Sequence, residues 1–198
     1  MNGFEKRTAA KKEQIVAATF DLMKASASGD FAMEEVAEKA GVSKTSIFKY
    51  FGTKEQLKVE VFRQYIETIR SGVRKIIDLD RPYEETMAEM LRFELDLVNQ
   101  SGNSFYLSLM SYMSEKGSDG LSRIMEDYVV ESYHMMLDLF HRGRKEGKVD
   151  WHYSDEFLMM YFQTLAGGIS NPGIYQKMLP YSHEWIQVVL QGLAPREK

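Results

Sequence analysis

Helical spacing of apolar residues recurs along the whole sequence, and this periodicity constrains the fold more than any other feature. In residues 8–24, for example, Ile15, Ala18, Leu22 and Met23 fall on one stripe of a helix. No segment stands out as alternating apolar and polar residues in the manner of a half-buried strand. The chain has 198 residues and only four prolines. The sequence therefore predicts an all-α fold of about nine helices, long enough to bury a core.

Capping and terminating residues set the expected helix boundaries. Asp30, Ser43 and Thr53 are the predicted N-caps of the second, third and fourth helices. Gly41 ends the second helix, because glycine takes a left-handed conformation without a Cβ penalty. The segment 170–180, SNPGIYQKMLP, is interpreted as a loop. The expected helices cover about 8–24, 31–40, 44–50, 54–77, 82–100, 104–115, 119–145, 154–169 and 182–193.

The composition excludes several classes of protein. There is no cysteine, which rules out a disulfide scaffold, a thiolate nucleophile and a Cys-ligated zinc site. The N-terminus is mixed in charge and lacks the apolar stretch of a secretory signal. The longest run of large apolar residues, FLMMYF at 157–162, is far shorter than the ~20 residues that span a bilayer. We expect a cytoplasmic protein that is not membrane-bound.

Charge is spread unevenly along the chain. Residues 1–58 hold ten Lys and Arg against eight Asp and Glu, a net charge of +2 in a chain whose total is −4. The remaining residues are net acidic, so the two parts are expected to have different roles.

Two short helices joined by a tight turn around Gly41 fit a helix-turn-helix. A small residue, Ala37, allows the helices to approach each other, and Val42 and Ile47 fill the gap between them. One face of the second short helix is then left exposed for base edges and phosphates in a major groove. The alternative is a solvated amphipathic helix whose lysines only keep it soluble. The candidate DNA-binding residues on this helix are Lys44, Thr45, Ser46, Lys49 and Tyr50.

The sequence QIVAATFDLM, followed by MEEVAEKAGVSKTSIFKYFGTKEQL, resembles the DNA-binding domain of the tetracycline-repressor (TetR) family of bacterial transcriptional regulators. The resemblance covers residues 14–57, and AGVSKTSIFKYFGTKEQL is its most specific part. It implies a three-helix DNA-binding domain, a divergent helical effector domain and a homodimer. We therefore predict a DNA-binding domain at 1–52 and a helical ligand-binding and dimerisation domain at 53–198. It also implies a repressor of a palindromic DNA operator that is usually released when a small molecule binds.

The resemblance assigns roles to individual residues. Lys44 and Thr45 fall where the family begins its base and phosphate contacts, and Lys49 and Tyr50 where it contacts the backbone and groove. Lys54, at the start of the next helix, matches the family's phosphate-contacting lysine, where charge and helix dipole add. A basic run before the first helix could reach neighbouring phosphates or could be a solvated tail; it comprises Lys6, Arg7, Lys11 and Lys12.

The chain departs from the family pattern at three places. The family commonly has tyrosine where this chain has Phe48, and often glycine at Thr45. It also commonly has threonine at the start of the second helix, where Phe31 and Ala32 stand here. These departures bear on the operator sequence and leave the fold unaffected.

Glu94 lies near the centre of the apolar stripe of the fifth helix, beside Met90 and Leu91. A buried carboxylate is costly unless it is paired. It is therefore either a structural partner of an arginine or lysine, a residue at a water-exposed stripe end, or a carboxylate in an effector cavity. Broad Met and aromatic faces nearby are either core or a pocket for an apolar ligand. The candidate ligand-binding residues are Met90, Phe93, Glu94, Tyr106, Met110 and Tyr128.

Glu131, His134, Asp138 and His141 line one face of the seventh helix and could suggest a metal site. A four-helix di-iron site needs a second Glu-x-x-His helix, and the sequence has none. We therefore predict no metal, no cofactor and no enzymatic activity, with a helical metal-dependent enzyme as one alternative. The other is a DNA-binding regulator without a small-molecule effector.

The helix at 154–169 carries apolar residues on two sides, whereas a helix at the edge of a monomer needs one apolar stripe. The alternative is a fully internal helix. We predict instead that this eighth helix and the ninth, at 182–193, pair with a second copy of the chain in a four-helix bundle.

Overall fold

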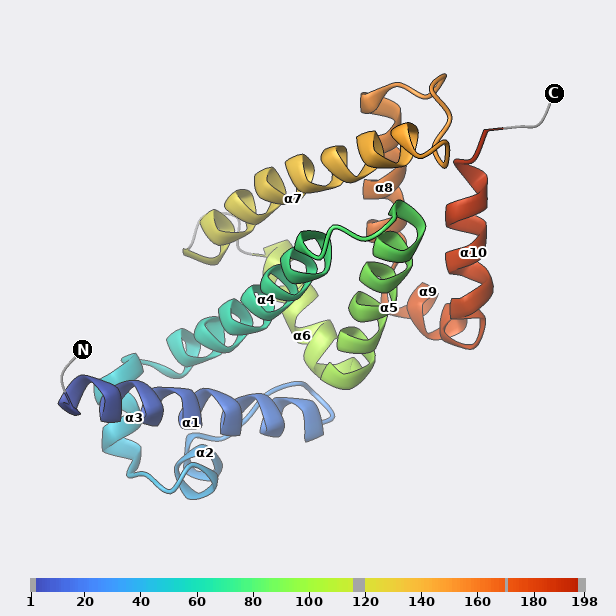
Figure 1. Ribbon diagram of the computed structural model, residues 1–198. Coiled ribbons are helices and arrows are strands. Elements are labelled where there is room, and N and C mark those ends of the chain that lie inside the picture. Colours follow the sequence, from blue (N-terminus) through green and yellow to red (C-terminus); the bar gives the residue numbers. More distant parts are fainter. Residues whose placement is uncertain (1–2, 116–119, 170, 196–198) are drawn as a thin grey trace. The chain divides into compact units, whose positions relative to one another are not determined.

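The computed structural model describes residues 3–115, 120–169 and 171–195, and all regular structure in these ranges is helical (Figure 1). The predicted all-α fold is confirmed. The helices are α1 (Gly3–Ala25), α2 (Met33–Lys39), α3 (Lys44–Phe51), α4 (Lys54–Asp78), α5 (Tyr83–Ser101), α6 (Asn103–Glu115), α7 (Gly120–Lys145), α8 (Asp155–Ile169), α9 (Pro172–Met178) and α10 (Ser182–Gly192), with a short 3₁₀ helix at Leu179–Tyr181. Within the described helices, none is both long and apolar enough to span a membrane.

Two segments differ from the sequence prediction. Residues 170–180 were expected to be a loop but contain α9, because the Asn171 side chain caps this helix. Its Oδ1 accepts hydrogen bonds from the backbone N–H groups of Gly173 and Ile174 at 3.0 and 3.2 Å. Helix α1 begins at Gly3, so the basic run at 6–12 lies within its first turns rather than before it.

Two of the three predicted N-caps are confirmed. The Ser43 hydroxyl accepts a hydrogen bond from the Ser46 N–H at 3.1 Å, and Thr53 Oγ1 accepts one from the Gln56 N–H at 3.1 Å. The prediction for Asp30 was wrong, because α2 begins two residues later, with Ala32 at the N-cap position. The Asp30 carboxylate instead accepts a hydrogen bond from Lys54.

The chain forms two compact units, and the first comprises residues 1–67 and 101–122. Its core contains Ile15, Met23, Val36, Ile47 and Leu57, all fully excluded from solvent. An aromatic cluster joins α1, α4 and α6, with the Phe105 ring 4.7 Å from that of Phe20 and 5.1 Å from that of Tyr65 between centroids. These contacts pack α1 against α4 and α6.

The second unit comprises residues 68–100 and 123–198. Its core is built from α5, α7, α8 and α10, with Tyr83, Leu139, Leu158 and Val189 among the buried side chains. The Tyr175 hydroxyl donates a hydrogen bond to the Leu95 carbonyl at 3.0 Å, which ties α9 to α5. The short helix missed by the sequence reading is therefore part of the core packing.

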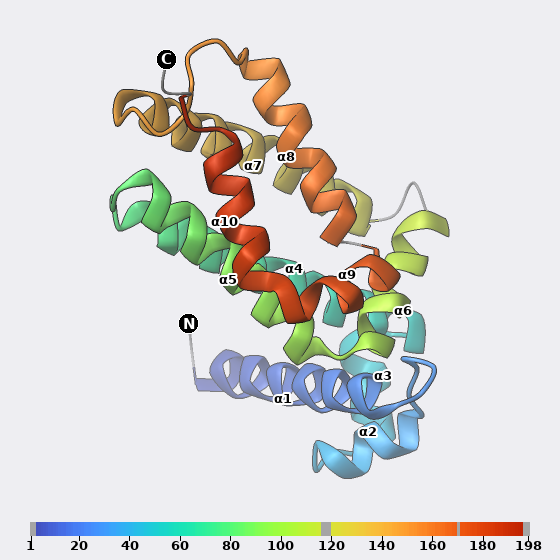
Figure 2. The same ribbon diagram turned by 90° about the vertical axis from the view of Figure 1, so that its right-hand side faces the viewer.

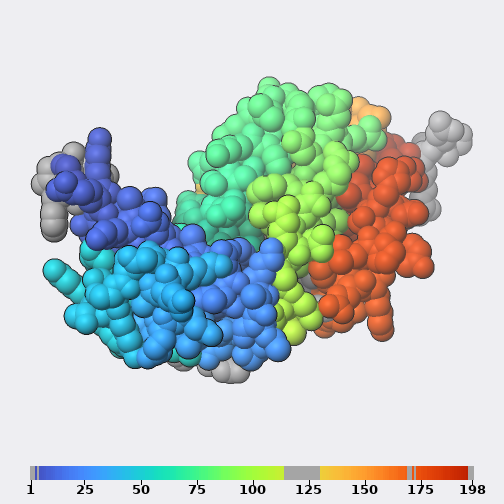
Figure 3. Space-filling model, turned by 90° about the horizontal axis from the view of Figure 1, so that it is seen from below, coloured from blue at the N-terminus to red at the C-terminus, as the bar shows by residue number. Residues whose placement is uncertain are grey.

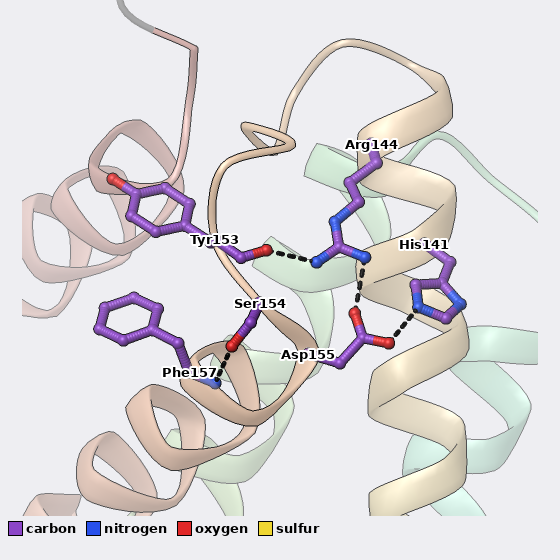
Figure 4. Close-up of polar contacts among 6 residues, drawn as sticks. All are labelled: His141, Arg144, Tyr153, Ser154, Asp155 and Phe157. Atoms are coloured by element: carbon purple, nitrogen blue, oxygen red, sulfur yellow. Dashed lines mark hydrogen bonds and ion pairs between the residues drawn. The ribbon is translucent and has the colours of Figure 1, made fainter.

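A polar cluster fixes the start of α8 against the end of α7 (Figure 4). The Asp155 carboxylate accepts hydrogen bonds from Arg144 Nη1 at 2.6 Å and His141 Nε2 at 3.0 Å. The guanidinium of Arg144 is almost fully buried and also donates to the Tyr153 carbonyl at 2.6 Å. The His141 hydrogen bond, partly opposed by burial, and the Arg144 guanidinium together lower the pKa of the Asp155 carboxyl.

Helix α4 is shared by the two units: Lys54 to Glu67 belong to the first, and Thr68 to Asp78 to the second. In the second unit, Arg70 and Arg74 of α4 both form ion pairs with Glu131 of α7. One continuous helix therefore leads from the predicted DNA-binding segment into the core of the second unit. The functional boundary at residue 52 stays a prediction.

Candidate nucleic-acid interface

The turn between α2 and α3 fixes the direction of α3. Gly41 has φ of +62°, and the Val42 N–H donates a hydrogen bond to the Ala37 carbonyl at 3.0 Å. This pattern closes the C-terminus of α2. Ile47 is completely buried and attaches the inner face of α3 to the first unit. The opposite face of α3 is therefore held towards solvent.

The exposed face of α3 consists of Lys44, Thr45, Phe48 and Lys49, with Tyr50 partly exposed. Phe48 is 42% exposed, although it is a large apolar side chain. Ser46 is partly buried, and its hydroxyl lies 2.8 Å from that of Ser43. Ser46 is therefore engaged in the cap of α3. The segments of α1 to α3 form one continuous surface in Figure 3.

The three lysines of this region differ in their partners. Within the part of the chain that the structure describes, Lys49 has no hydrogen bond or ion pair. Lys44, the first residue of α3, pairs with Glu34 of α2. Lys54, the first residue of α4, donates to Asp30 at 2.8 Å, and its ammonium lies 5.1 Å from the centre of the Phe31 ring. Lys49 is thus the freest cation of the three.

The pKa values of the two carboxylates reflect these pairs. The hydrogen bond from Lys44 lowers the pKa of Glu34. Burial by itself raises the pKa of Asp30, but the hydrogen bond from Lys54 and one from the Phe31 backbone outweigh it, so that the pKa falls. Both carboxylates are therefore ionised at neutral pH, and each offsets the charge of one lysine.

The basic run lies along α1, with all four of its side chains exposed. The ammonium of Lys12 is 5.9 Å from the centre of the Phe51 ring, at the end of α3. This contact places at least one cation of α1 beside α3. The role of the run in DNA binding stays a prediction.

Sequence reasoning missed Asp30 and Glu34 as parts of this surface. Their lysine partners are 24 and 10 residues away in the chain. Neither distance is a helical i, i+3 or i, i+4 spacing, so no periodicity could have revealed the pairs. Phe48 was noted only as a departure from tyrosine, and its exposure was not predicted.

The predicted effector residues are divided between the units. Met90, Phe93 and Glu94 share α5 in the second unit. Met90 is completely buried, and the Phe93 ring packs directly on Gly72 of α4. Tyr106 and Met110 lie on α6 in the first unit, where Tyr106 is buried. The side chain of Tyr128 lies outside the described residues. The structure therefore brings three of the six residues together on α5.

Glu94 is partly exposed and has no hydrogen bond or ion pair among the described residues. Burial raises the pKa of its carboxyl to about 7. The alternative of a structural ion pair with an arginine or lysine thus finds no described partner. An isolated carboxyl of this kind can accept a hydrogen bond from a ligand or bind a cationic one.

On α7, the residues that could suggest a metal site are either paired with other side chains or exposed; they are Glu131, His134, Asp138 and His141. Glu131 pairs with the arginines of α4, and His141 with Asp155 of α8. His134 and Asp138 are exposed. In the ranges described above, no three His, Cys, Asp or Glu side chains are grouped so that they could hold a metal ion. These residues give no geometric support to the metal-enzyme alternative.

Comparison with known proteins adds a family match to this geometry. Residues 15–61 match the family model described as bacterial regulatory proteins, tetR family. A curated relative, the HTH-type transcriptional regulator RutR of Escherichia coli strain K12, is 40% identical over 58 residues. That match covers 29% of this chain and 27% of RutR, so it spans about a quarter of the relative's length.

Solved structures share the fold over nearly the whole chain. The ketosteroid regulator KstR2 of Mycobacterium tuberculosis has a TM-score of 0.65 at 14% identity, covering 93% of this chain and 95% of its own. FadR of Bacillus subtilis, solved with stearoyl-CoA, has a TM-score of 0.66 at 14% identity, and the match covers 91% of this chain and 98% of FadR. A TetR regulatory protein of Mycobacterium vanbaalenii has a TM-score of 0.65 at 18% identity, and the match covers 97% of this chain and 99% of that protein. At these identities the likeness establishes the fold alone.

Proposed function

The chain belongs to the tetR family of bacterial regulatory proteins, and from this premise we propose that it is a transcriptional repressor that binds a palindromic operator as a homodimer. A small-molecule effector would release it. The observation that carries the proposal is the exposed face of α3, which a buried Ile47 and a capped N-terminus hold towards solvent. The proposal places the protein in the cytoplasm with its DNA.

In the proposed complex, α3 enters the major groove, and its exposed residues make different contacts with the DNA. Lys49 and Thr45 are free to reach base edges or phosphates, and Tyr50 contacts the backbone beside them. The exposed ring of Phe48 suits an apolar contact with a thymine methyl group. Lys44 and Lys54 stand at helix N-termini, where they can meet phosphates.

Exposed apolar side chains on α8 and α10 support the homodimer. Met160 of α8 is 58% exposed, Val188 of α10 is 65% exposed, and Phe157 of α8 is exposed as well. Figure 2 shows both helices on the side of the second unit that faces the viewer. A second copy that covers these faces would place two α3 helices for successive major grooves, about 34 Å apart.

Effector control would act through α4. This helix begins at Lys54 beside the recognition segment, and in the second unit Gly72 packs against Phe93, next to Glu94. A ligand that contacts α5 and favours one position of α4 would shift the population between DNA-binding and released dimers. A coupling of ~1–3 kcal/mol is typical of such systems.

The effector itself is proposed only by class. The isolated Glu94 favours lipophilic cations and hydrogen-bond donors, and the stearoyl-CoA bound by the FadR fold neighbour adds fatty acyl compounds. A thermal-shift screen with both classes tests this part. Stabilisation by neither class would favour a regulator without a small-molecule effector.

DNA binding is tested by fluorescence anisotropy with the promoter DNA beside the protein's own gene, across a salt series. Lys49→Ala should weaken binding and make the salt slope shallower by about one, because it removes a phosphate-directed cation. Lys54→Ala should have the same effect to a smaller extent, because Lys54 is already paired with Asp30. Lys75→Ala is the matched control, an exposed lysine in the last turn of α4. Equal effects of all three substitutions would contradict the proposal.

A further inference from the structure

Two acidic side chains lie on the surface that the proposed function assigns to DNA. Asp30, in the loop before α2, holds Lys54 at 2.8 Å, and Glu34 of α2 holds Lys44. All four side chains are substantially exposed to solvent. A phosphate group that approaches either lysine must therefore displace a carboxylate and then remain near its negative charge.

We propose that Asp30 and Glu34 are specificity-determining residues, which compete with DNA phosphates for Lys54 and Lys44 and so suppress sequence-independent binding. The inference rests on the proposed DNA-binding function and assigns to this surface a role for its carboxylates. Each acts through a lysine rather than by touching the bases, so both are positioning residues.

The binding free energy that a lysine contributes depends on whether it is already paired. A free lysine that neutralises a phosphate releases a counterion from DNA, which drives sequence-independent association. A lysine already paired with a carboxylate gains less, because one ion pair is exchanged for another. Lys49, which has no described partner, keeps its full contribution.

Operator DNA and random DNA differ in the contacts that compensate for breaking a lysine–carboxylate ion pair. On the operator, base contacts from the exposed face of α3 add to the phosphate contacts. On random DNA the phosphate contacts stand almost alone, so the carboxylates weaken that binding by a larger share. The difference between the two affinities is the specificity ratio that governs operator occupancy.

A third ion pair of the same unit supplies a matched control. Asp21 of α1 pairs with Lys39 of α2 at 3.0 Å, and both side chains are about half exposed. Lys39 is not among the predicted DNA-binding residues. Asp21→Asn therefore changes the charge of the unit by the same amount as Asp30→Asn, without releasing a lysine of the α3 surface.

The experiment measures anisotropy with a random-sequence duplex and with promoter DNA, across a salt series, for the full-length chain. Asp30→Asn and Glu34→Gln should each tighten binding to the random duplex by about two- to fivefold, the range expected from freeing one exposed ion pair. Each should also steepen the salt slope by up to about 0.9. Binding to promoter DNA should change less, so the specificity ratio falls.

A double substitution tests whether Asp30 acts through its lysine. In a Lys54→Gln background, Asp30→Asn should give no further gain on random DNA, since there is no cation left to release. A gain that persists in this background, or one that Asp21→Asn matches, would overturn the inference and leave only a general charge effect. Glu34→Gln provides the same comparison if Asp30→Asn melts at a lower temperature than the wild type.

The outcomes also separate this inference from the proposed function. Wild-type binding that Lys49→Ala weakens, with no tightening by Asp30→Asn or Glu34→Gln, would overturn the inference alone. No binding of the wild type to either DNA would overturn the proposed function and the inference together.

Discussion

At Glu94, a partly exposed position is combined with a raised carboxyl pKa. Glu94 lies on α5 beside the buried Met90 and Leu95, without a described partner, and burial raises its pKa to about 7. Its ordinary value is 4.5. Between these two pH values the folded chain binds more protons than the unfolded chain, so stability falls as pH rises.

Glu94→Gln should therefore stabilise the protein at pH 8 and change little at pH 4.5. The pKa difference corresponds to at most about 3 kcal/mol, and partial exposure of the carboxyl brings the expected gain to about 1–3 kcal/mol. Urea unfolding at the two pH values measures the effect. Glu85→Gln, an exposed glutamate of the same helix, is the control, and an equal gain from both substitutions would contradict the prediction.

The same substitution bears on the effector. If Glu94 meets a cationic ligand, Glu94→Gln should abolish stabilisation by lipophilic cations in the thermal-shift screen and leave DNA binding intact. An unchanged response to a cation that stabilises the wild type would remove Glu94 from the effector site.

At the scale of elements, helices α4 and α5 meet at one glycine. A Cβ atom at position 72 would collide with the Phe93 ring. The absence of a side chain at this position is what allows the ring to lie against α4. The contact is part of the proposed path from effector to DNA.

Gly72→Ala should destabilise the protein by a net ~1–2 kcal/mol, because overpacking outweighs the helix propensity that alanine gains. Phe93→Leu removes the atom that would collide, so the double variant should be more stable than the sum of the two single changes predicts. Additive losses in urea unfolding would show that the ring does not constrain position 72.

Most helices could be predicted from sequence because their ends carry local signals. The hydroxyls of Ser43 and Thr53 cap α3 and α4 as expected. Helix α9 was missed because its asparagine, proline and glycine were read as loop formers, although asparagine followed by proline is also a helix start. At Asp30 the local cap signal lost to a long-range partner, Lys54.

The candidate site could be predicted only in part, for the same reason. The exposed face of α3 follows from the spacing of Val42 and Ile47, which is local. The pairing of Lys44 and Lys54 with carboxylates depends on how α2, α3 and α4 pack, which no local pattern encodes. The resemblance to a known family identified the lysines but not their acidic partners.

For the whole molecule, the central question is what covers α8 and α10. The described chain leaves Met160 and Val188 more than half exposed on these helices. Exposed apolar side chains on two helices of one unit favour a partner interface. The proposed occupant is a second copy of the chain.

Introducing charge on both helices should dissociate the dimer. The double variant Met160→Glu, Val188→Glu buries two carboxylates in the proposed interface, and the mass measured by light scattering should fall from two chains to one at micromolar concentration. Leu79→Glu is the matched control, a residue equally exposed but placed after α4. If only the Leu79→Glu control lost the dimer, the interface would lie outside α8 and α10.

Hydrogen exchange of the free protein and of its complex with promoter DNA tests the claim that α3 is the DNA-contacting helix. We expect slower amide exchange in residues 33–58 when DNA is added, with the strongest protection in α3 and at the start of α4. Protection confined to α5–α10, with α3 unchanged in a complex that forms, would contradict the account.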